Sequence, residues 1–242
     1  SANSPAKHIF GSSGKVVQPM EIKILDADGV EQPFGVKGEI CIKGENVMAG
    51  YWKNPKSTAS TIVDGWLHTG DMGYMRDEEM LYVAGRFKSL LIAADGEKYS
   101  PEGIEENLVE NSKYIDGALL HNSQDPYTIA LVTPNKEALK KYAQELGLDP
   151  ASQEAKEKML LLIESEVNAY RKGGKFAGAF PDRWLPAAIC VLPEPWTEQN
   201  HFLNSSMKVV RGRVEEAYKE HMAFAYTPEG KNLINPMNIA SL

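Results

Sequence analysis

Three charged side chains could take part in chemistry: Asp71, Arg86 and Lys208. Asp71 directly follows Thr69 and Gly70. A carboxylate offers two acceptor oxygens, which can take both protons of a diol. A planar, permanently charged guanidinium suits a diffuse anion. An ammonium placed between two anions neutralises charge as they approach each other. Each residue also has an ordinary alternative, because turn aspartates commonly bond their own backbone and most Lys and Arg side chains are surface charges.

Other catalytic patterns find no support in this sequence. It contains no HExxH, no paired CxxC and no GxSxG, and its five histidines have no metal-ligand spacing. Its two cysteines, Cys41 and Cys190, are too few and too far apart for a disulfide framework or a zinc site. We therefore expect no metal centre and no nucleophilic triad.

Three longer motifs surround the charged residues and occur in a fixed order. They read GYWKNP at 50–55 with DGWLHTGDMGY at 64–74, then GRFKSLLI at 85–92, then EQNHFLNSSMK at 198–208. Together they resemble the adenylate-forming (AMP-binding) superfamily of acyl-CoA synthetases, luciferases and peptide-synthetase adenylation domains. The last motif and RWLP at 183–186 look most like bacterial long-chain fatty acid CoA ligases.

The resemblance implies a role for each of five residues. Asp71 would bind the ribose hydroxyls of the nucleotide, and Arg86 would reach its ribose and phosphate. Lys208 would be catalytic, neutralising charge as a carboxylate attacks the α-phosphate. Lys88 would be the hinge of a mobile lid rather than a solvated charge. Gly96 would border the coenzyme A (pantetheine) channel, a role compatible with its simpler reading as the left-handed residue of an Asp-Gly turn.

The implied activity is a ligase reaction in two steps. ATP and a fatty acid give acyl-AMP, and coenzyme A then displaces AMP; Mg²⁺ would accompany ATP, although no ligand for it is identifiable. One alternative is an adenylation domain that delivers acyl groups to a carrier protein. Another is a non-catalytic interaction module or pseudoenzyme. The resemblance begins late in the family pattern, so we expect a C-terminal piece whose partner is the missing N-terminal domain and which is inactive alone.

The elements that position these residues change character along the chain. Alternating apolar residues predict strands at 20–24, 39–43 and 80–84, whereas helical spacing begins after Ser100, a candidate N-cap, and recurs at 135–146, 154–171 and 208–222. The predicted class is α+β, with a β-rich, barrel-like subdomain followed by a small mixed α/β lid. On the family resemblance, residues 4–85 close the large adenylation domain and residues 86–242 form the lid.

Composition limits the partners. The 242 residues carry 26 Lys and Arg against 33 Asp and Glu, a net charge of −7, which argues against nucleic acid. Apolar runs are far shorter than the roughly 18 residues of a membrane span. We expect a cytoplasmic protein, with peripheral membrane association of the intact protein left open, and small-molecule substrates.

Overall fold

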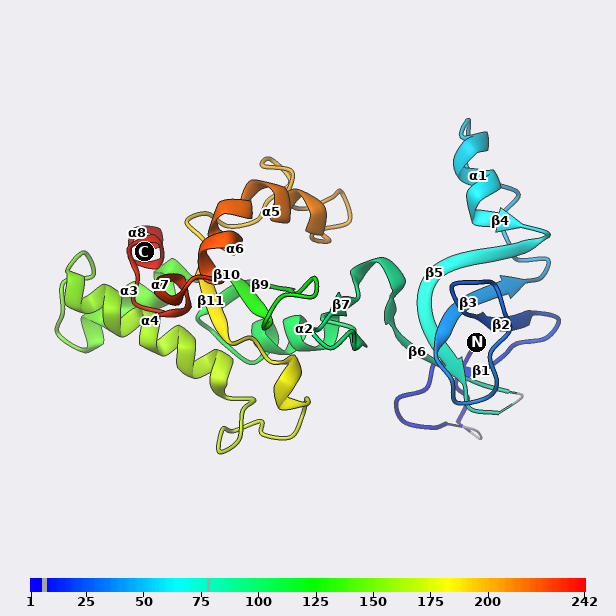
Figure 1. Ribbon diagram of the computed structural model, residues 1–242, viewed down its shortest axis with the longest axis horizontal. Coiled ribbons are helices and arrows are strands. Elements are labelled where there is room, and N and C mark those ends of the chain that lie inside the picture. The colour runs from blue at the N-terminus through cyan, green and yellow to red at the C-terminus, as the bar shows by residue number, and fades with distance from the viewer. Residues whose placement is uncertain (6–7, 78) are drawn as a thin grey trace. The chain divides into compact units, whose positions relative to one another are not determined.

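The computed structural model describes residues 1–5, 8–77 and 79–242, apart from the side chain of Lys88. The chain divides into two compact units, Ser1–Leu90 and Leu91–Leu242, whose elements are labelled in Figure 1. The first unit is built mainly of strands and the second mixes helices with strands, so the predicted α+β class is confirmed.

The first unit is an antiparallel sheet. Its strands are β1 (Gly14–Lys15), β2 (Glu21–Leu25), β3 (Gly38–Lys43), β4 (Ile62–Val63), β5 (Trp66–Met75) and β6 (Met80–Arg86). Their order is β1-β6-β5-β3-β2, with β4 paired to β5. The pairings described make an open sheet with β1 and β2 at its ends, rather than the closed barrel that a barrel-like subdomain suggests. The long strand β5 curves across the unit in Figure 1, and the core beneath it contains Ile24, Ile40, Met75 and Leu81.

Two short helical elements flank this sheet. Helix α1 (Pro55–Thr61) was not predicted, although Asn54 caps it by accepting from the Ser57 N–H at 3.0 Å and Pro55 occupies a first-turn position. The 3₁₀ helix η1 (Phe87–Ser89) follows β6 directly. The boundary between the two units therefore falls just after η1.

The second unit contains a two-stranded hairpin and a three-stranded sheet. The hairpin pairs β7 (Leu91–Ile92) with β8 (Lys98–Tyr99), and the sheet has the order β11-β10-β9. Its strands are β9 (Ile115–His121), β10 (Ile129–Pro134) and β11 (Ala188–Val191). The helices are α2 (Glu102–Glu110), α3 (Lys136–Glu145), α4 (Gln153–Asn168), η2 (Asp182–Trp184), α5 (Arg211–Ala217), α6 (Lys219–Ala225), α7 (Pro228–Lys231) and α8 (Pro236–Ser241).

Helices cover both faces of the three-stranded sheet (Figure 1). Successive side chains of a strand point to opposite faces. In β10, Ala130 and Val132 join the cluster formed with α2, α3 and α4, whereas Ile129 and Leu131 join the cluster formed with α5 and α6. All four side chains are fully buried, which explains why this strand reads as a continuous apolar run.

Two predicted helix boundaries are wrong. Helix α2 begins at Glu102 after Pro101, and the Ser100 hydroxyl bonds the Glu102 carboxylate instead of capping the helix backbone. The helix predicted at 208–222 starts only at Arg211 and breaks at Tyr218 into α5 and α6. Tyr218 is buried against Phe202, and its hydroxyl donates to Glu194 at 3.3 Å. Tertiary packing of this ring accompanies a backbone break that helical periodicity does not show.

Candidate functional site

The Thr-Gly-Asp segment forms a bulge in the middle of β5. Register passes from Glu39 opposite Met72 to Cys41 opposite His68, so Thr69, Gly70 and Asp71 together face the single residue Ile40. Gly70 adopts φ +71°, a left-handed conformation that side chains disfavour. Bulges redirect side chains out of the regular pleat and are common beside active sites.

Two side chains fix the shape of this bulge. The Thr69 hydroxyl donates to the Ile40 carbonyl at 2.7 Å and accepts from the Asp71 N–H at 3.0 Å. The Glu39 carboxylate accepts from the Gly70 N–H at 3.0 Å. The backbone around Asp71 is thus held by three hydrogen bonds, which leaves its carboxylate in a defined position at the sheet surface.

Asp71 and Arg86 lie opposite each other on neighbouring strands. Arg86 pairs in register with Asp71 across β5 and β6, and its Nε lies 3.2 Å from Asp71 Oδ1. The Arg86 side chain is 65% exposed and that of Asp71 is 35% exposed, so the ion pair is solvated and contributes at most about 1 kcal/mol to stability. A ligand can therefore rearrange the pair at little energetic cost. The structure thus brings together two of the predicted residues.

Lys208 lies in a tight exposed loop before α5. A bridge between Leu203 and Val209 closes this loop, and Asn204 Oδ1 accepts from the backbone N–H groups of Ser206 and Lys208 at 2.9 and 3.0 Å. The lysine side chain is exposed to solvent. Its position is set by the backbone of the loop, so its ammonium is available to a ligand.

A partly buried ion pair anchors the helix that follows this loop. Arg211, the first residue of α5, donates to both carboxylate oxygens of Glu105 at 2.6 and 2.9 Å, and its second nitrogen donates to the Leu120 carbonyl at 2.6 Å. Burial raises the pKa of Glu105, and the neighbouring Arg211 charge opposes that rise. Arg211 thus links α5 to α2 and β9, and it follows Lys208 by three residues in the sequence.

Gly96 lies at the turn of the β7–β8 hairpin. Its φ is +86°, and its N–H donates to the Ala93 carbonyl at 2.9 Å, as expected for the left-handed residue of an Asp-Gly turn. A Cβ at Gly96 would meet no atom within 4 Å. The next residue, Glu97, is fixed by Arg183 and by the Trp184 Nε1–H at 3.2 Å. The loop is therefore anchored on one side and open at the glycine.

The remaining predicted residue, Lys88, is the central residue of η1, and its side chain lies outside the described part of the structure. Asp71 and Arg86 belong to the first unit, whereas Gly96 and Lys208 belong to the second. Sequence reasoning missed two residues that shape the site, Glu39 and Asn204. An acidic residue two positions before a buried cysteine in an alternating strand was the available signal for Glu39.

The described helices include none with the length and apolar character needed to cross a bilayer.

Comparisons with known proteins agree on one superfamily. The family model described as AMP-binding enzyme matches residues 2–52. A 2-succinylbenzoate–CoA ligase of Bacillus cytotoxicus is 44% identical over 117 residues, which are 48% of this chain and 24% of that protein. Long-chain-fatty-acid–CoA ligase 5 of Mus musculus is 31% identical over 230 residues, which are 93% of this chain and 33% of that protein. The chain thus spans a third or less of the length of these relatives.

A solved structure shows the same fold. The adenylation domain of a carboxylate reductase from Mycobacterium chelonae matches with a TM-score of 0.70 at 24% identity, covering 88% of this chain and 31% of that one. At this identity the likeness concerns the fold alone. The two sequence relatives are named for different acids, so they leave the substrate open.

Proposed function

We propose that the chain is part of an AMP-binding enzyme, as the family match and the relatives support. In that enzyme it supplies the ribose-binding carboxylate and the catalytic lysine of an AMP-forming acid–thiol ligase. In this proposal residues 4–85 complete the large adenylation domain and residues 86–242 are its lid. The observation that carries the proposal is the Asp71–Arg86 pair, which sets acceptor oxygens beside a guanidinium on a bulge held by Glu39 and Thr69. That arrangement suits a ribose diol next to a phosphate.

The first half-reaction joins a carboxylate to AMP. A carboxylate oxygen attacks the α-phosphorus of ATP, the bond to the β-phosphate oxygen breaks, and pyrophosphate leaves. Asp71 accepts from the ribose hydroxyls while Arg86 turns from the carboxylate toward phosphate. Lys208 places its ammonium between the two approaching anions, where it stabilises the charge that builds in the transition state.

The second half-reaction transfers the acyl group. The coenzyme A thiol loses its proton, its sulfur attacks the acyl carbonyl carbon, and AMP leaves. We propose that rotation at Lys88 brings the Gly96 loop to the reaction, where the missing side chain lets the pantetheine arm pass close to backbone. Mg²⁺ would enter as part of the ATP substrate, and we assign it no ligand in this chain.

A long-chain fatty acid is the substrate we propose. The relative named for such acids matches 93% of this chain, whereas the relative named for an aromatic acid matches 48% of it. The full-length ligase should release pyrophosphate from ATP faster with a long-chain acid as substrate than with 2-succinylbenzoate. The reverse order would reassign the substrate and leave the ligase chemistry intact.

A cytoplasmic location of this protein stays a prediction.

The decisive experiment separates the half-reactions in the full-length ligase that contains this chain. Lys208→Ala should slow acyl-AMP formation by about 10²- to 10³-fold, the usual cost of losing one preorganised electrostatic contact. Thioester formation from supplied acyl-AMP should continue at the original rate. The matched control is Lys172→Ala, which removes another exposed lysine of the same unit. Equal losses in both half-reactions, or an equal effect of the control, would refute the role of Lys208.

One alternative acceptor of the acyl group is a carrier protein. Its phosphopantetheine arm presents the same thiol chemistry as coenzyme A. Incubating the ligase with acyl-AMP and each acceptor in turn distinguishes them, because our proposal requires faster transfer to free coenzyme A.

A further inference from the structure

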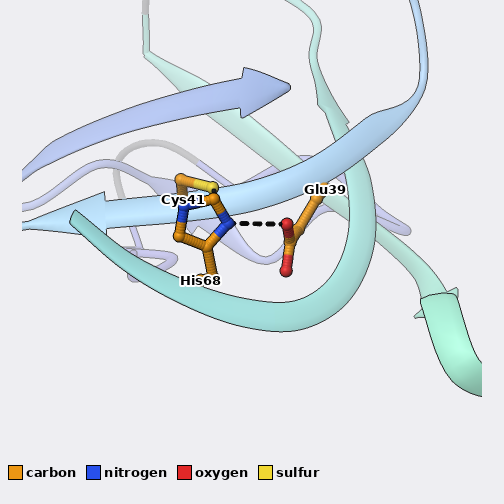
Figure 2. Close-up of side chains that lie close together, drawn as sticks. All are labelled: Glu39, Cys41 and His68. Carbon is orange, nitrogen blue, oxygen red and sulfur yellow. Dashed lines mark hydrogen bonds and ion pairs between the residues drawn. The ribbon is translucent and has the colours of Figure 1, made fainter. Parts of the chain in front are cut away.

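Three different metal-binding donors meet on the first unit. His68 Nδ1 lies 2.8 Å from Glu39 Oε2 and 3.5 Å from Cys41 Sγ, and one donor atom from each residue lies within 4.8 Å of the others. Figure 2 shows the imidazole nitrogen facing the carboxylate, with the sulfur beside the same ring. A thiol, an imidazole and a carboxylate are all common ligands of zinc.

Strand geometry explains why these residues converge. Glu39 and Cys41 are two positions apart on β3, so they share one face of the sheet. His68 lies directly opposite Cys41 on β5, immediately before the Thr69–Asp71 bulge. Because the ligand set combines two strands, the spacing of histidines and cysteines along the sequence does not show it.

The geometry does not fit a nucleophilic triad. Such a triad uses one imidazole nitrogen for the nucleophile and the other for the acid. Here both the thiol and the carboxylate face the same nitrogen, Nδ1 of His68. One nitrogen cannot accept the thiol proton while it donates to the carboxylate, so the cluster points to shared coordination of an ion.

We propose that Glu39, Cys41 and His68 bind one zinc ion, with a fourth coordination position left for water. Zinc lies about 2.3 Å from sulfur and about 2.0 to 2.1 Å from nitrogen or oxygen. Tetrahedral angles then place sulfur and nitrogen about 3.5 Å apart, which equals the Cys41–His68 distance of 3.5 Å. Nitrogen and oxygen need about 3.3 Å, so the Glu39 oxygen must move outward from its present 2.8 Å.

The surroundings allow an ion to enter and to be neutralised. Cys41 is fully buried, whereas the side chains of His68 and Glu39 are 29% and 23% exposed, so the ion approaches from the side of these two residues. Binding replaces the thiol proton of Cys41 with the metal and releases that proton. The His68 proton moves from Nδ1 to Nε2, so that Nδ1 offers its lone pair. Thiolate and carboxylate then balance both charges of the ion.

Binding is compatible with the neighbouring bulge. Glu39 uses Oε1 to accept from the Gly70 N–H at 3.0 Å and Oε2 to contact His68. The ion would take Oε2 and leave the bond to Gly70 in place. The zinc proposal therefore does not depend on the ligase proposal, and either can fail alone.

Cobalt is the probe for the test, since it replaces zinc in tetrahedral sites and its thiolate complexes absorb in the near ultraviolet. We expect the reduced 242-residue chain to bind one Co²⁺ with a thiolate charge-transfer band, which Zn²⁺ then abolishes by displacement. Cys41→Ser should lose the band. The matched control, Cys190→Ser, removes the other buried cysteine and should keep it.

A second variant protects the test against misfolding. His68→Asn keeps an N–H donor near the position of Nδ1 and removes the ligand lone pair, so the fold should persist while zinc affinity falls by at least about 10- to 100-fold in competition with a chelator. Circular dichroism checks that each variant is folded. The proposal is overturned if the chain gives no band, if Cys190→Ser loses it, or if folded His68→Asn binds zinc as tightly as the original chain.

Discussion

Asn204 forms hydrogen bonds with both the backbone carbonyl and the backbone N–H of Lys208. The Asn204 N–H donates to the Lys208 carbonyl at 2.9 Å, and Asn204 Oδ1 accepts from the Lys208 N–H at 3.0 Å. Between them Met207 adopts φ +60°, a conformation that favours glycine. The side chain of Asn204 therefore stabilises the loop conformation that presents the proposed catalytic ammonium.

Asn204→Ala should loosen this loop and slow acyl-AMP formation in the full-length ligase by about 5- to 150-fold, because it removes two side-chain hydrogen bonds, each worth about 0.5 to 1.5 kcal/mol net. Asn204→Asp keeps the acceptor oxygen and should restore most of the rate. Pyrophosphate release measures the first half-reaction, and transfer from supplied acyl-AMP measures the second, which should not change. A general folding defect would instead slow both half-reactions.

Asp71→Ala should lower kcat/KM for ATP by about 10- to 150-fold, because hydrogen bonds to a charged group contribute about 1.5 to 3 kcal/mol. The fold should lose no more than about 1 kcal/mol, since the ion pair with Arg86 is solvated. Steady-state kinetics at varied ATP and urea unfolding measure the two quantities. Asp28→Ala, in an exposed turn of the same unit, is the control. Unchanged kinetics would return Asp71 to the role of a turn residue.

Because Cys190 is buried, we expect the free energy of unfolding to fall at alkaline pH. Burial raises the pKa of its thiol from 9.0 to about 12. The folded state holds this proton more tightly than the unfolded state, so the stabilisation is present below pH 9 and declines as pH rises from about 9 toward 12. Between pH 8 and pH 10 the single thiol should cost about 1.4 kcal/mol of unfolding free energy.

Cys190→Ala removes this titration. Urea unfolding at both pH values should show a smaller alkaline loss in the variant, by about 1.4 kcal/mol. The cavity left by the substitution acts equally at both pH values and cancels in the difference. Identical pH dependence in the two proteins would contradict the raised thiol pKa.

Strands β2, β3 and β6 and helices α2 to α4 could be predicted because burial imposes a period, whereas the long strand β5 and helices α1, α7 and α8 were not predicted. Residues 129–132 of β10 read as a continuous apolar run since helices cover both faces of the sheet, and α4 shows a buried stripe including Leu160 and Ile163. The residues at which helices begin and end were predicted less reliably. Ser100 has a good capping side chain but bonds Glu102, and nothing in the periodicity of 208–222 shows the break at Tyr218.

The site residues differ in how far sequence could place them. Asp71 and Arg86 were identified singly by motif, and their pairing depends on strand register, which the sequence does not state. The bulge shifts that register, so the contacts of Glu39 with Gly70 and His68 could not be predicted from alternation along β3 alone. Cross-strand relationships of this kind need the structure.

Lys88 provides the last prediction, which concerns rotation of the lid. It occupies the middle of the 3₁₀ helix η1, and the boundary between the compact units follows at Leu90 and Leu91. In 3₁₀ helices φ is typically about −50° to −70°. Proline fixes φ near −65°, so Lys88→Pro fits this conformation and hinders others. If this conformation serves adenylation, the variant should form acyl-AMP but transfer it slowly to coenzyme A in the full-length ligase. Lys88→Ala, which leaves the backbone free, should retain both half-reactions. Normal overall turnover by Lys88→Pro would rule out a hinge at this residue.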